Sequence, residues 1–235
     1  MPAARIPHDE PERLAALAAF EVLDTGADER FDAITQLLAS ILDVPIALVS
    51  IVDAKRQWFK SRVGLDASET DRDVAFCAHA ILSDELLVVE DATTDPRFRD
   101  NPLVQDGLRI RFYAGAPLCV DAGLRLGTLC AIDQRPRQLG PHEREQLRLL
   151  ARQVVALLEL HRVSHQLAAA LARVRTLSEL IPICAHCRKV RDAHEWRTLE
   201  SYVAAQTGSR FSHGICPACL HLHFPEHAEG LVDPR

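Results

Sequence analysis

The chain has 235 residues, of which 48% are hydrophobic and 26% are charged, a balance typical of globular proteins. No apolar run is long enough to cross a bilayer, and the first residues lack the basic start and apolar stretch of a secretory signal, so we expect a cytoplasmic protein that does not enter membranes. A formal net charge of −6 disfavours general attraction to nucleic acid.

The elements expected in chain order combine helices with a run of short strands. Apolar residues at helical spacing predict helices over 12–24, 31–42 and 75–82. Short β-branched and apolar runs predict strands over 45–53, 57–63, 87–90, 112–120 and 125–133. Helices followed by a meander of strands and a further helix indicate an α+β fold.

A long helix is expected over 143–180, where proline and glycine are absent and most residues favour helix. Its first half should pack on the sheet of its own domain. The second half repeats apolar residues at the spacing of a coiled coil, at Leu160, Val163, Leu167, Ala170, Val174 and Leu177. We therefore predict a homodimer held by a coiled-coil linker at 161–180, ended by Pro182 because proline cannot continue a helix.

The first domain resembles a known family. The runs FDAITQLLASILDVPIALVSIVD, DATTDPRFRDNPLV, IRFYAGAPL and LGTLCAID are similar to GAF domains of bacterial signalling proteins, over residues 12–160. The resemblance implies a central antiparallel sheet of five or six strands, with helices on one face that pack into dimers and a ligand pocket on the other. It also implies a sensor in signal transduction that binds a small molecule or senses redox state.

The resemblance places the ligand pocket around one short helix and the strands beneath it. The candidate ligand-binding residues are Trp58, Phe76, Cys77, His79, Phe112 and Tyr113. For each aromatic residue the alternative is packing in the core, because large apolar side chains are usually buried for stability. His79 either presents a donor to a ligand or forms a hydrogen bond inside the core. The ligand itself stays open.

The chain is expected not to be an enzyme, because it has no ATP-binding, phosphoacceptor or diguanylate cyclase motif. The alternative is a thiol enzyme of the free methionine-R-sulfoxide reductase type, which shares the GAF fold. Such an enzyme needs a reactive thiolate and a resolving thiol, and Cys119 and Cys130 fall on adjacent predicted strands. Their spacing departs from that family's pattern. The alternative for Cys77, Cys119 and Cys130 is that each is a small buried hydrophobic residue, which is the more common role of a free cysteine.

Two CxxC pairs, Cys184 with Cys187 and Cys216 with Cys219, lie near the end of the chain. Such pairs are typical of a closed tetrahedral zinc site, because a two-residue spacer lets both sulfurs approach one ion. Iron or a redox disulfide is the alternative. Because the module at 181–226 is too short to fold on its own core, we expect zinc to supply much of its folding free energy.

The same module resembles a tail that recurs in bacterial sensory proteins after PAS, GAF or receiver domains. The runs LIPICAHCRKVRD, LESYV and FSHGICPACLHLHFPE carry the resemblance, and the layout suits a treble-clef-like zinc finger. A closed four-cysteine site has no open position for water, so hydrolysis by the metal is not supported. We expect a structural module that docks an unknown signalling partner.

Overall fold

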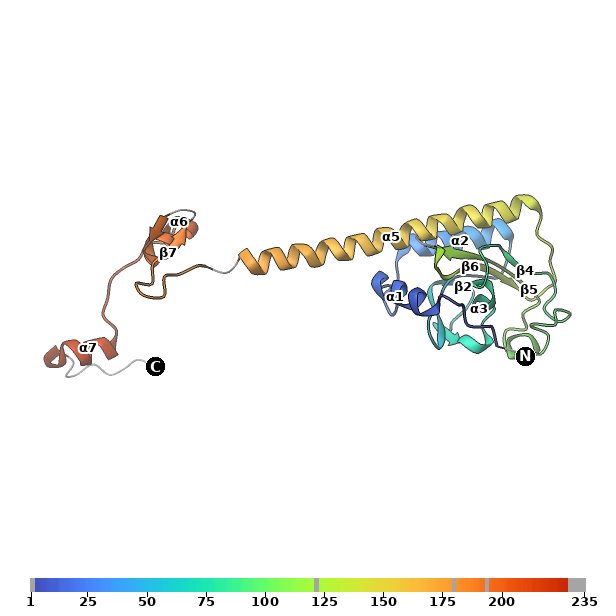
Figure 1. Ribbon diagram of the computed structural model, residues 1–235, viewed down its shortest axis with the longest axis horizontal. Helices are drawn as coiled ribbons and strands as arrows, with labels where there is room; N and C mark the ends of the chain where they lie inside the picture. Colours follow the sequence, from blue (N-terminus) through green and yellow to red (C-terminus); the bar gives the residue numbers. More distant parts are fainter. Residues whose placement is uncertain (1–2, 121–122, 179–180, 193–194, 228–235) are drawn as a thin grey trace. The chain divides into compact units, whose positions relative to one another are not determined.

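The computed structural model describes residues 3–120, 123–178, 181–192 and 195–227 (Figure 1). It divides the chain into two compact units, Met1–Ala170 and Leu171–Arg235. Each unit is treated by itself. Within the described residues, no helix combines the length and the apolar character needed to cross a membrane.

A six-stranded antiparallel sheet forms the centre of the first unit, in the order β3-β2-β1-β6-β5-β4. Its strands are β1 (Ile46–Val52), β2 (Arg56–Val63), β3 (Glu69–Asp71), β4 (Leu87–Val89), β5 (Phe112–Cys119) and β6 (Arg125–Asp133). The expected antiparallel sheet flanked by helices is thus confirmed. The short strand β3 was not expected, because its three polar residues lack any apolar alternation.

Alternation along the strands divides the first unit into two apolar cores on opposite faces of the sheet. In β1, Val49 and Ile51 belong to one core and Leu48 and Val52 to the other. The first face, here called the helix face, is covered by α1 (Glu10–Phe20), α2 (Glu29–Leu42) and the start of α5 (Pro141–Ser178). The second, the pocket face, is covered by η1 (Arg72–Val74), α3 (Phe76–Ala80), α4 (Pro102–Gln105) and the neighbouring loops. Figure 1 shows α2 and α5 on one side of the strands and α3 on the other.

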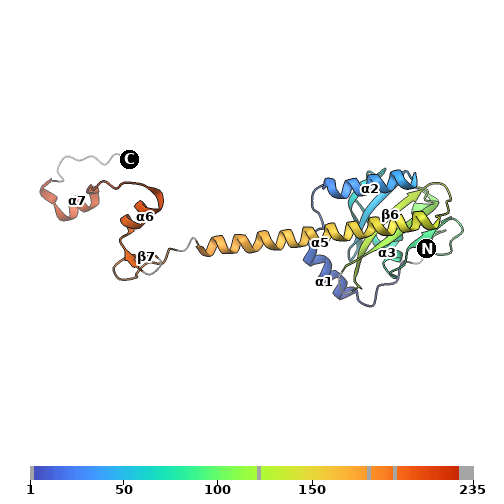
Figure 2. The same cartoon turned by 90° about the horizontal axis from the view of Figure 1, so that it is seen from above.

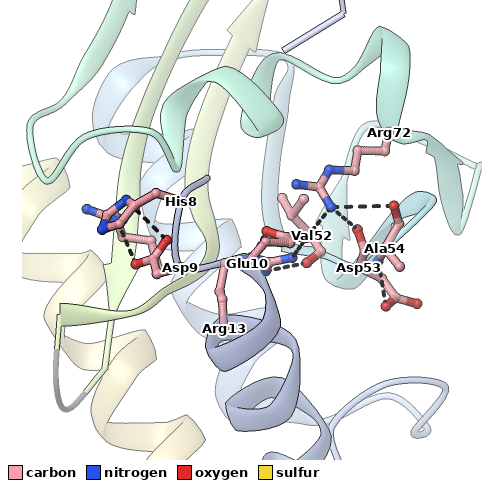
Figure 3. Close-up of polar contacts among 9 residues, drawn as sticks. His8, Asp9, Glu10, Arg13, Val52, Asp53, Ala54 and Arg72 are labelled. Carbon is pink, nitrogen blue, oxygen red and sulfur yellow. Dashed lines mark hydrogen bonds and ion pairs between the residues drawn. The ribbon is translucent and has the colours of Figure 1, made fainter. Parts of the chain in front are cut away.

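Three buried charged side chains anchor α1 to the sheet (Figure 3). The Arg13 guanidinium is fully buried and donates two hydrogen bonds to the Glu10 carboxylate, at 2.7 and 2.8 Å, and a third to the carbonyl of Val52 at 2.6 Å. Arg72 donates to Glu10 from the opposite side, at 2.5 Å. Burial raises the pKa of Glu10, but these hydrogen bonds outweigh it and lower the pKa to about 2. Glu10 is therefore ionised wherever the protein is folded near neutral pH.

Helix α5 changes its surroundings along its length. In its first half Leu147, Ala151, Val154 and Leu158 are buried against the helix face, and Figure 2 shows the helix running across the sheet beside α2. Further on, the apolar residues Leu160, Val163, Leu167 and Ala170 are exposed, as is Leu171. The side chains of Val174 and Leu177, expected in the same seam, lie outside the described residues.

The second unit has little apolar core of its own. Strands β7 (Val190–Asp192) and β8 (Glu195–Arg197) pair, and helices α6 (Leu199–Thr207) and α7 (Pro217–His223) and the turn η3 (Pro225–His227) follow. Within its described residues, Val190 is the one buried side chain. Large apolar residues here are about half exposed or more: Trp196, Leu199, Phe211, Ile215, Leu222 and Phe224.

Candidate functional site

A buried cysteine pair lies where α3 meets the pocket face of the sheet. The sulfurs of Cys77, in α3, and Cys130, in β6, are 3.9 Å apart, and both side chains are buried. The Thr128 hydroxyl donates to the Cys77 sulfur at 3.1 Å, and the Tyr113 hydroxyl donates to it at 3.4 Å. Ser50, which faces Thr128 across β1 and β6, donates instead to the side-chain oxygen of Gln57, at 3.4 Å. The sheet thus directs two hydroxyls at the Cys77 sulfur.

Gly115 makes the position of Tyr113 possible. The two residues lie on the same face of β5, and Gly115 is also the cross-strand neighbour of Cys130. A Cβ atom at residue 115 would come within 2.2 Å of the Tyr113 hydroxyl and 2.7 Å of its ring. The missing side chain therefore leaves the space in which the Tyr113 ring lies over the strand and reaches Cys77.

The hydrogen bonds around Cys77 change the acidity of both thiols. Burial raises the pKa of Cys77, but hydrogen bonds from Cys130, Thr128 and Tyr113 outweigh it and lower the pKa to about 6. The pKa of Cys130 lies well above its usual value, because its proton is held in the hydrogen bond to Cys77 and because its side chain is buried. The pair therefore favours one thiolate, on Cys77, beside one protonated thiol.

Aromatic residues cover the cysteine pair. The ring of Phe76 stacks on Phe98 with centroids 4.0 Å apart and tilts against Tyr113 at 5.2 Å. His79 contacts Phe98 edge to face at 4.8 Å, and its buried Nε2 atom has no hydrogen-bond partner among the described residues. Burial and the nearby Arg97 charge lower the pKa of His79, so its ring is neutral near pH 7.

A small cavity of about 20 Å³ lies beside Cys77. It is lined by Leu48, Gln57, Phe59, Leu65, Thr70, Phe76, Cys77, Leu103, Leu108, Ile110, Tyr113 and Ile132. A cavity of this size holds about one water molecule. A larger ligand would therefore enter only if α3 or the loop around α4 moved outward.

The structure brings together four of the six residues expected in the ligand pocket. Phe76, Cys77 and Tyr113 line the cavity, and His79 lies next to them against Phe98. Trp58 and Phe112 belong to the core of the helix face instead. Strand alternation sends their neighbours, Phe59 and Tyr113, to the pocket face.

Sequence reasoning missed Thr128 and Ser50, whose hydroxyls complete the surroundings of Cys77. Both are small polar residues within apolar strands, and each is fully buried. A buried hydroxyl needs a partner, so this pattern is a signal for a polar contact inside the core. The identity of that partner depends on strand register, which the sequence does not state.

The predicted strand neighbours Cys119 and Cys130 do not form a pair. Along β5 and β6, Cys130 lies opposite Gly115, whereas Cys119 lies opposite Arg125 near the end of the hairpin. The Cys119 sulfur lies 3.8 Å from an oxygen of Asp84, and burial together with this carboxylate raises its pKa. A dithiol exists in the first unit, but its members are Cys77 and Cys130.

A second, polar cavity of about 500 Å³ lies on the helix side, beside a β-bulge in β2. The cross-strand partners step from Phe59 to Ser61, so Lys60 is the extra residue. Its buried ammonium donates to the Thr25 hydroxyl and the Gly26 carbonyl, both at 2.8 Å. These bonds fasten the loop before α2 to the sheet.

Each CxxC pair in the second unit has a local shape suited to a metal ion. The amide of Cys187 donates to the Cys184 sulfur at 3.5 Å, and Arg188 turns the chain with a φ of 62°. Cys216 precedes α7, and Cys219 lies in its first turn. Across the described part of the chain, however, no three potential ligands gather, so a joined four-cysteine site is not shown.

The sequence pattern of the GAF domain matches residues 26–158, more than half of the chain and nearly all of the sheet and its covering helices. The chain belongs to the GAF-domain family. Its GAF domain includes the cysteine pair, the cavity and the first part of α5.

Over 171 residues, the chain is 48% identical to a cyclic di-GMP phosphodiesterase of Pseudomonas aeruginosa. This stretch covers 73% of the chain but 27% of the relative, so the chain spans about a quarter of the relative's length. The finding corrects the expectation that the chain is not an enzyme, because a protein this similar is named as one. The absence of three motifs excluded only the activities that those motifs mark.

Two solved structures share the fold at low identity. A free methionine-R-sulfoxide reductase of Neisseria meningitidis is 17% identical, with a TM-score of 0.49, and the match covers 70% of this chain and 99% of that one. The GAF domain of a phosphoenolpyruvate-protein phosphotransferase of Acinetobacter is 14% identical, with a TM-score of 0.48, and covers 66% of this chain and 98% of that one. Neither similarity bears on function.

Proposed function

We propose that this chain is a sensor that controls the turnover of cyclic di-GMP. The observation that carries the proposal is the 48% identity, within a GAF-domain protein, to a relative named for cyclic di-GMP hydrolysis. Most of the relative's length lies outside the similarity. The proposal therefore gives this chain a part in controlling cyclic di-GMP and leaves hydrolysis by the chain itself to be tested.

The signal is received at the pocket face of the GAF domain. Phe76, Cys77 and Tyr113 line a cavity that is nearly closed, and His79 presents an unpaired buried nitrogen beside them. A small, largely apolar molecule that contacts these side chains would hold α3 away from the sheet. A change in the redox state of Cys77 would act on the same helix.

The signal passes along α5 in a homodimer. Leu160, Val163 and Leu167 are spaced by three and four residues and are about half exposed in the single chain. A row with this spacing is buried when two such helices pair in a coiled coil. The first half of α5 packs on the sheet, so a shift of the GAF core would reach the paired half directly.

The second unit binds one zinc ion through Cys184, Cys187, Cys216 and Cys219 and docks a signalling partner. Both cysteine pairs are solvent-accessible, and backbone amides point at the Cys184 and Cys216 sulfurs and lower the pKa of each. Thiolate donors suit zinc. We expect the half-exposed apolar residues of this unit to pack into a small core around the metal when it binds.

The test measures cyclic di-GMP in host cells that lack the chain, carry it, or carry a Phe76→Ala variant with an altered pocket. A difference between the first two strains, reduced by the variant, is expected. Equal levels in all three strains would refute the proposal.

Assays of the purified chain against cyclic di-GMP and against free methionine-R-sulfoxide establish where turnover takes place. Hydrolysis of cyclic di-GMP would assign the phosphodiesterase activity to this chain itself. Thiol-dependent reduction of methionine sulfoxide, with unchanged cyclic di-GMP in cells, would replace the sensor role by the reductase alternative.

A further inference from the structure

We propose that Cys77 and Cys130 form a hydroperoxide-reactive dithiol, in which Cys77 is oxidised first and Cys130 then closes a disulfide. The inference rests on the sensor role proposed above and names the chemistry of its signal. The two sulfurs are 3.9 Å apart and belong to different layers, one on α3 and one on β6. Because bonded sulfurs are about 2.05 Å apart, the pair needs to close by roughly 2 Å.

Cys77 is the attacking residue because its sulfur accepts hydrogen bonds from two hydroxyls. The hydroxyls of Thr128 and Tyr113 donate to it at 3.1 and 3.4 Å. A neutral thiol is a weak acceptor, whereas a thiolate is stabilised by each of these donors. The low pKa of Cys77, about 6, agrees with this geometry, and the thiolate is the reactive form.

Cys130 first supplies a proton and then resolves the intermediate. The Cys77 thiolate attacks the terminal oxygen of a hydroperoxide ROOH, the O–O bond breaks, and the leaving alkoxide takes the proton of Cys130. This gives a sulfenic acid on Cys77, the alcohol ROH and a thiolate on Cys130. The Cys130 thiolate then attacks the Cys77 sulfur, forms the disulfide and releases hydroxide. Two electrons pass from the thiols to the peroxide bond.

The cavity beside Cys77 admits a small oxidant. Its volume of about 20 Å³ fits roughly one water-sized group. Leu103 and Leu108, which line it from α4 and the following turn, are partly exposed. Hydrogen peroxide is the hydroperoxide closest to this size, and an alkyl hydroperoxide would enter only if the cover of the cavity moved.

Disulfide formation would move the element that covers the pocket. Pulling Cys77 toward β6 carries α3 with it, and Phe76 in the same helix is stacked on Phe98. The Phe76–Phe98 stack cannot keep its present geometry once the disulfide has formed, because protein interiors are close-packed. Oxidation would therefore reshape the cover of the pocket.

The test exposes the reduced full-length protein to hydrogen peroxide, blocks free thiols and maps tryptic peptides without reduction. We expect the peptide at 73–97 to become linked to the peptide at 126–137, before Cys119 in the peptide at 112–125 is modified. This order is unusual, since the partly exposed Cys119 reacts after the fully buried Cys77. Modification of Cys119 first, or linkage only in denaturant, would overturn the proposal.

Three variants assign the roles of the thiols. Cys130→Ser should leave a sulfenic acid on Cys77 that dimedone traps, and Cys77→Ser should leave Cys130 unmodified at the same peroxide dose. Cys119→Ser is the matched control and should form the disulfide at the wild-type rate. Labelling of Cys130 in Cys77→Ser would show that Cys130 reacts without its partner and would contradict the assigned order.

A fourth variant, Thr128→Val, separates this chemistry from simple packing. Loss of the hydroxyl should shift the pH midpoint for alkylation of Cys77 upward and slow its oxidation several-fold. A purely structural Thr128 would leave that midpoint unchanged. The proposals fail separately: cyclic di-GMP control without disulfide formation refutes the dithiol, and disulfide formation without any change in cyclic di-GMP refutes the sensor role.

Discussion

The Tyr113 hydroxyl lies 3.4 Å from the Cys77 sulfur, in a position that depends on the absence of a side chain two residues further along the same strand. Helix α3, strand β5 and Gly115 together hold the contact between Tyr113 and Cys77 inside an apolar core. Such a contact is sensitive to small changes in packing, because the surrounding side chains leave it little room to adjust.

Gly115→Ala should displace the Tyr113 ring and destabilise the GAF domain. The added methyl would overlap the ring and hydroxyl, and overpacking of this kind typically costs about 1–3 kcal/mol. Gly26→Ala is the matched control, since a Cβ there meets nothing within 4 Å, and it should be neutral or stabilising by about 0.4–1 kcal/mol. Urea denaturation measures both, and equal stabilities of the two variants would contradict this account.

Glu10→Gln should destabilise the GAF domain by about 3–5 kcal/mol, because the guanidiniums of Arg13 and Arg72 would stay buried without their carboxylate. Glu12→Gln, an exposed change on the same helix, is the control and should cost little. Denaturant midpoints at pH 7 compare the two variants. A Glu10→Gln protein as stable as the control would show that the cluster does not hold α1.

The Glu10 carboxylate also predicts a loss of stability in acid. Its pKa is about 2 in the folded protein and near 4.5 when unfolded, so its contribution is complete above pH 4.5 and is lost as the pH falls from there towards 2. The difference in stability between the wild type and Glu10→Gln should therefore shrink as the pH falls from 4.5 towards 2. Thermal melts of both proteins from pH 7 to pH 2 check the sign, and a constant difference would contradict it.

Leu167→Glu should convert the dimer into a monomer, because a charge in the centre of the seam would be buried between the two helices. Ala169→Glu adds the same charge to an exposed position outside the spacing of Leu160, Val163 and Leu167, and the dimer should persist. Sedimentation velocity distinguishes the two states. A wild-type protein that sediments as a monomer would remove the coiled-coil proposal altogether.

Cys216→Ser should abolish stoichiometric zinc binding and unfold the second unit alone. With one buried side chain among its described residues, that unit has little to hold it without the metal. Cys119→Ser should keep one zinc per chain. Native mass spectrometry counts the metal, and hydrogen exchange should show lost protection beyond residue 181 with an unchanged GAF domain. Full protection in the zinc-free protein would contradict the expected dependence.

The sequence was sufficient to predict most of the fold because the signals that define it are local. Short apolar runs over 45–53 and 112–120 predicted β1 and β5 within one residue at each end, and the helical repeat predicted α2 within two. The three residues of β3 contain no apolar alternation, and their pairing with β2 depends on a turn that places them there. Short polar elements of this kind follow from tertiary contacts.

The candidate site was less predictable because register decides it. Phe112 and Tyr113 were both expected in the pocket, but neighbours in a strand point to opposite faces, and the register decides which of them faces the pocket. Likewise, Cys77 and Cys130 are 53 residues apart, and their contact requires the strand order of the sheet and the placement of α3. Adjacent strands suggested Cys119 instead, whereas the register places Arg125 opposite it.

The position of α5 in the chain has a consequence for synthesis on the ribosome. The helix face of the sheet, with Trp58 and Phe112 in its core, is closed by Leu147, Val154 and Leu158 of α5. These residues are made after every strand of the sheet, so a nascent chain that ends before Pro141 presents an open apolar surface. Such surfaces attract chaperones and favour aggregation. The newly made GAF domain therefore depends on protection until the first half of α5 has emerged, and a gene truncated before Leu147 would yield an insoluble product.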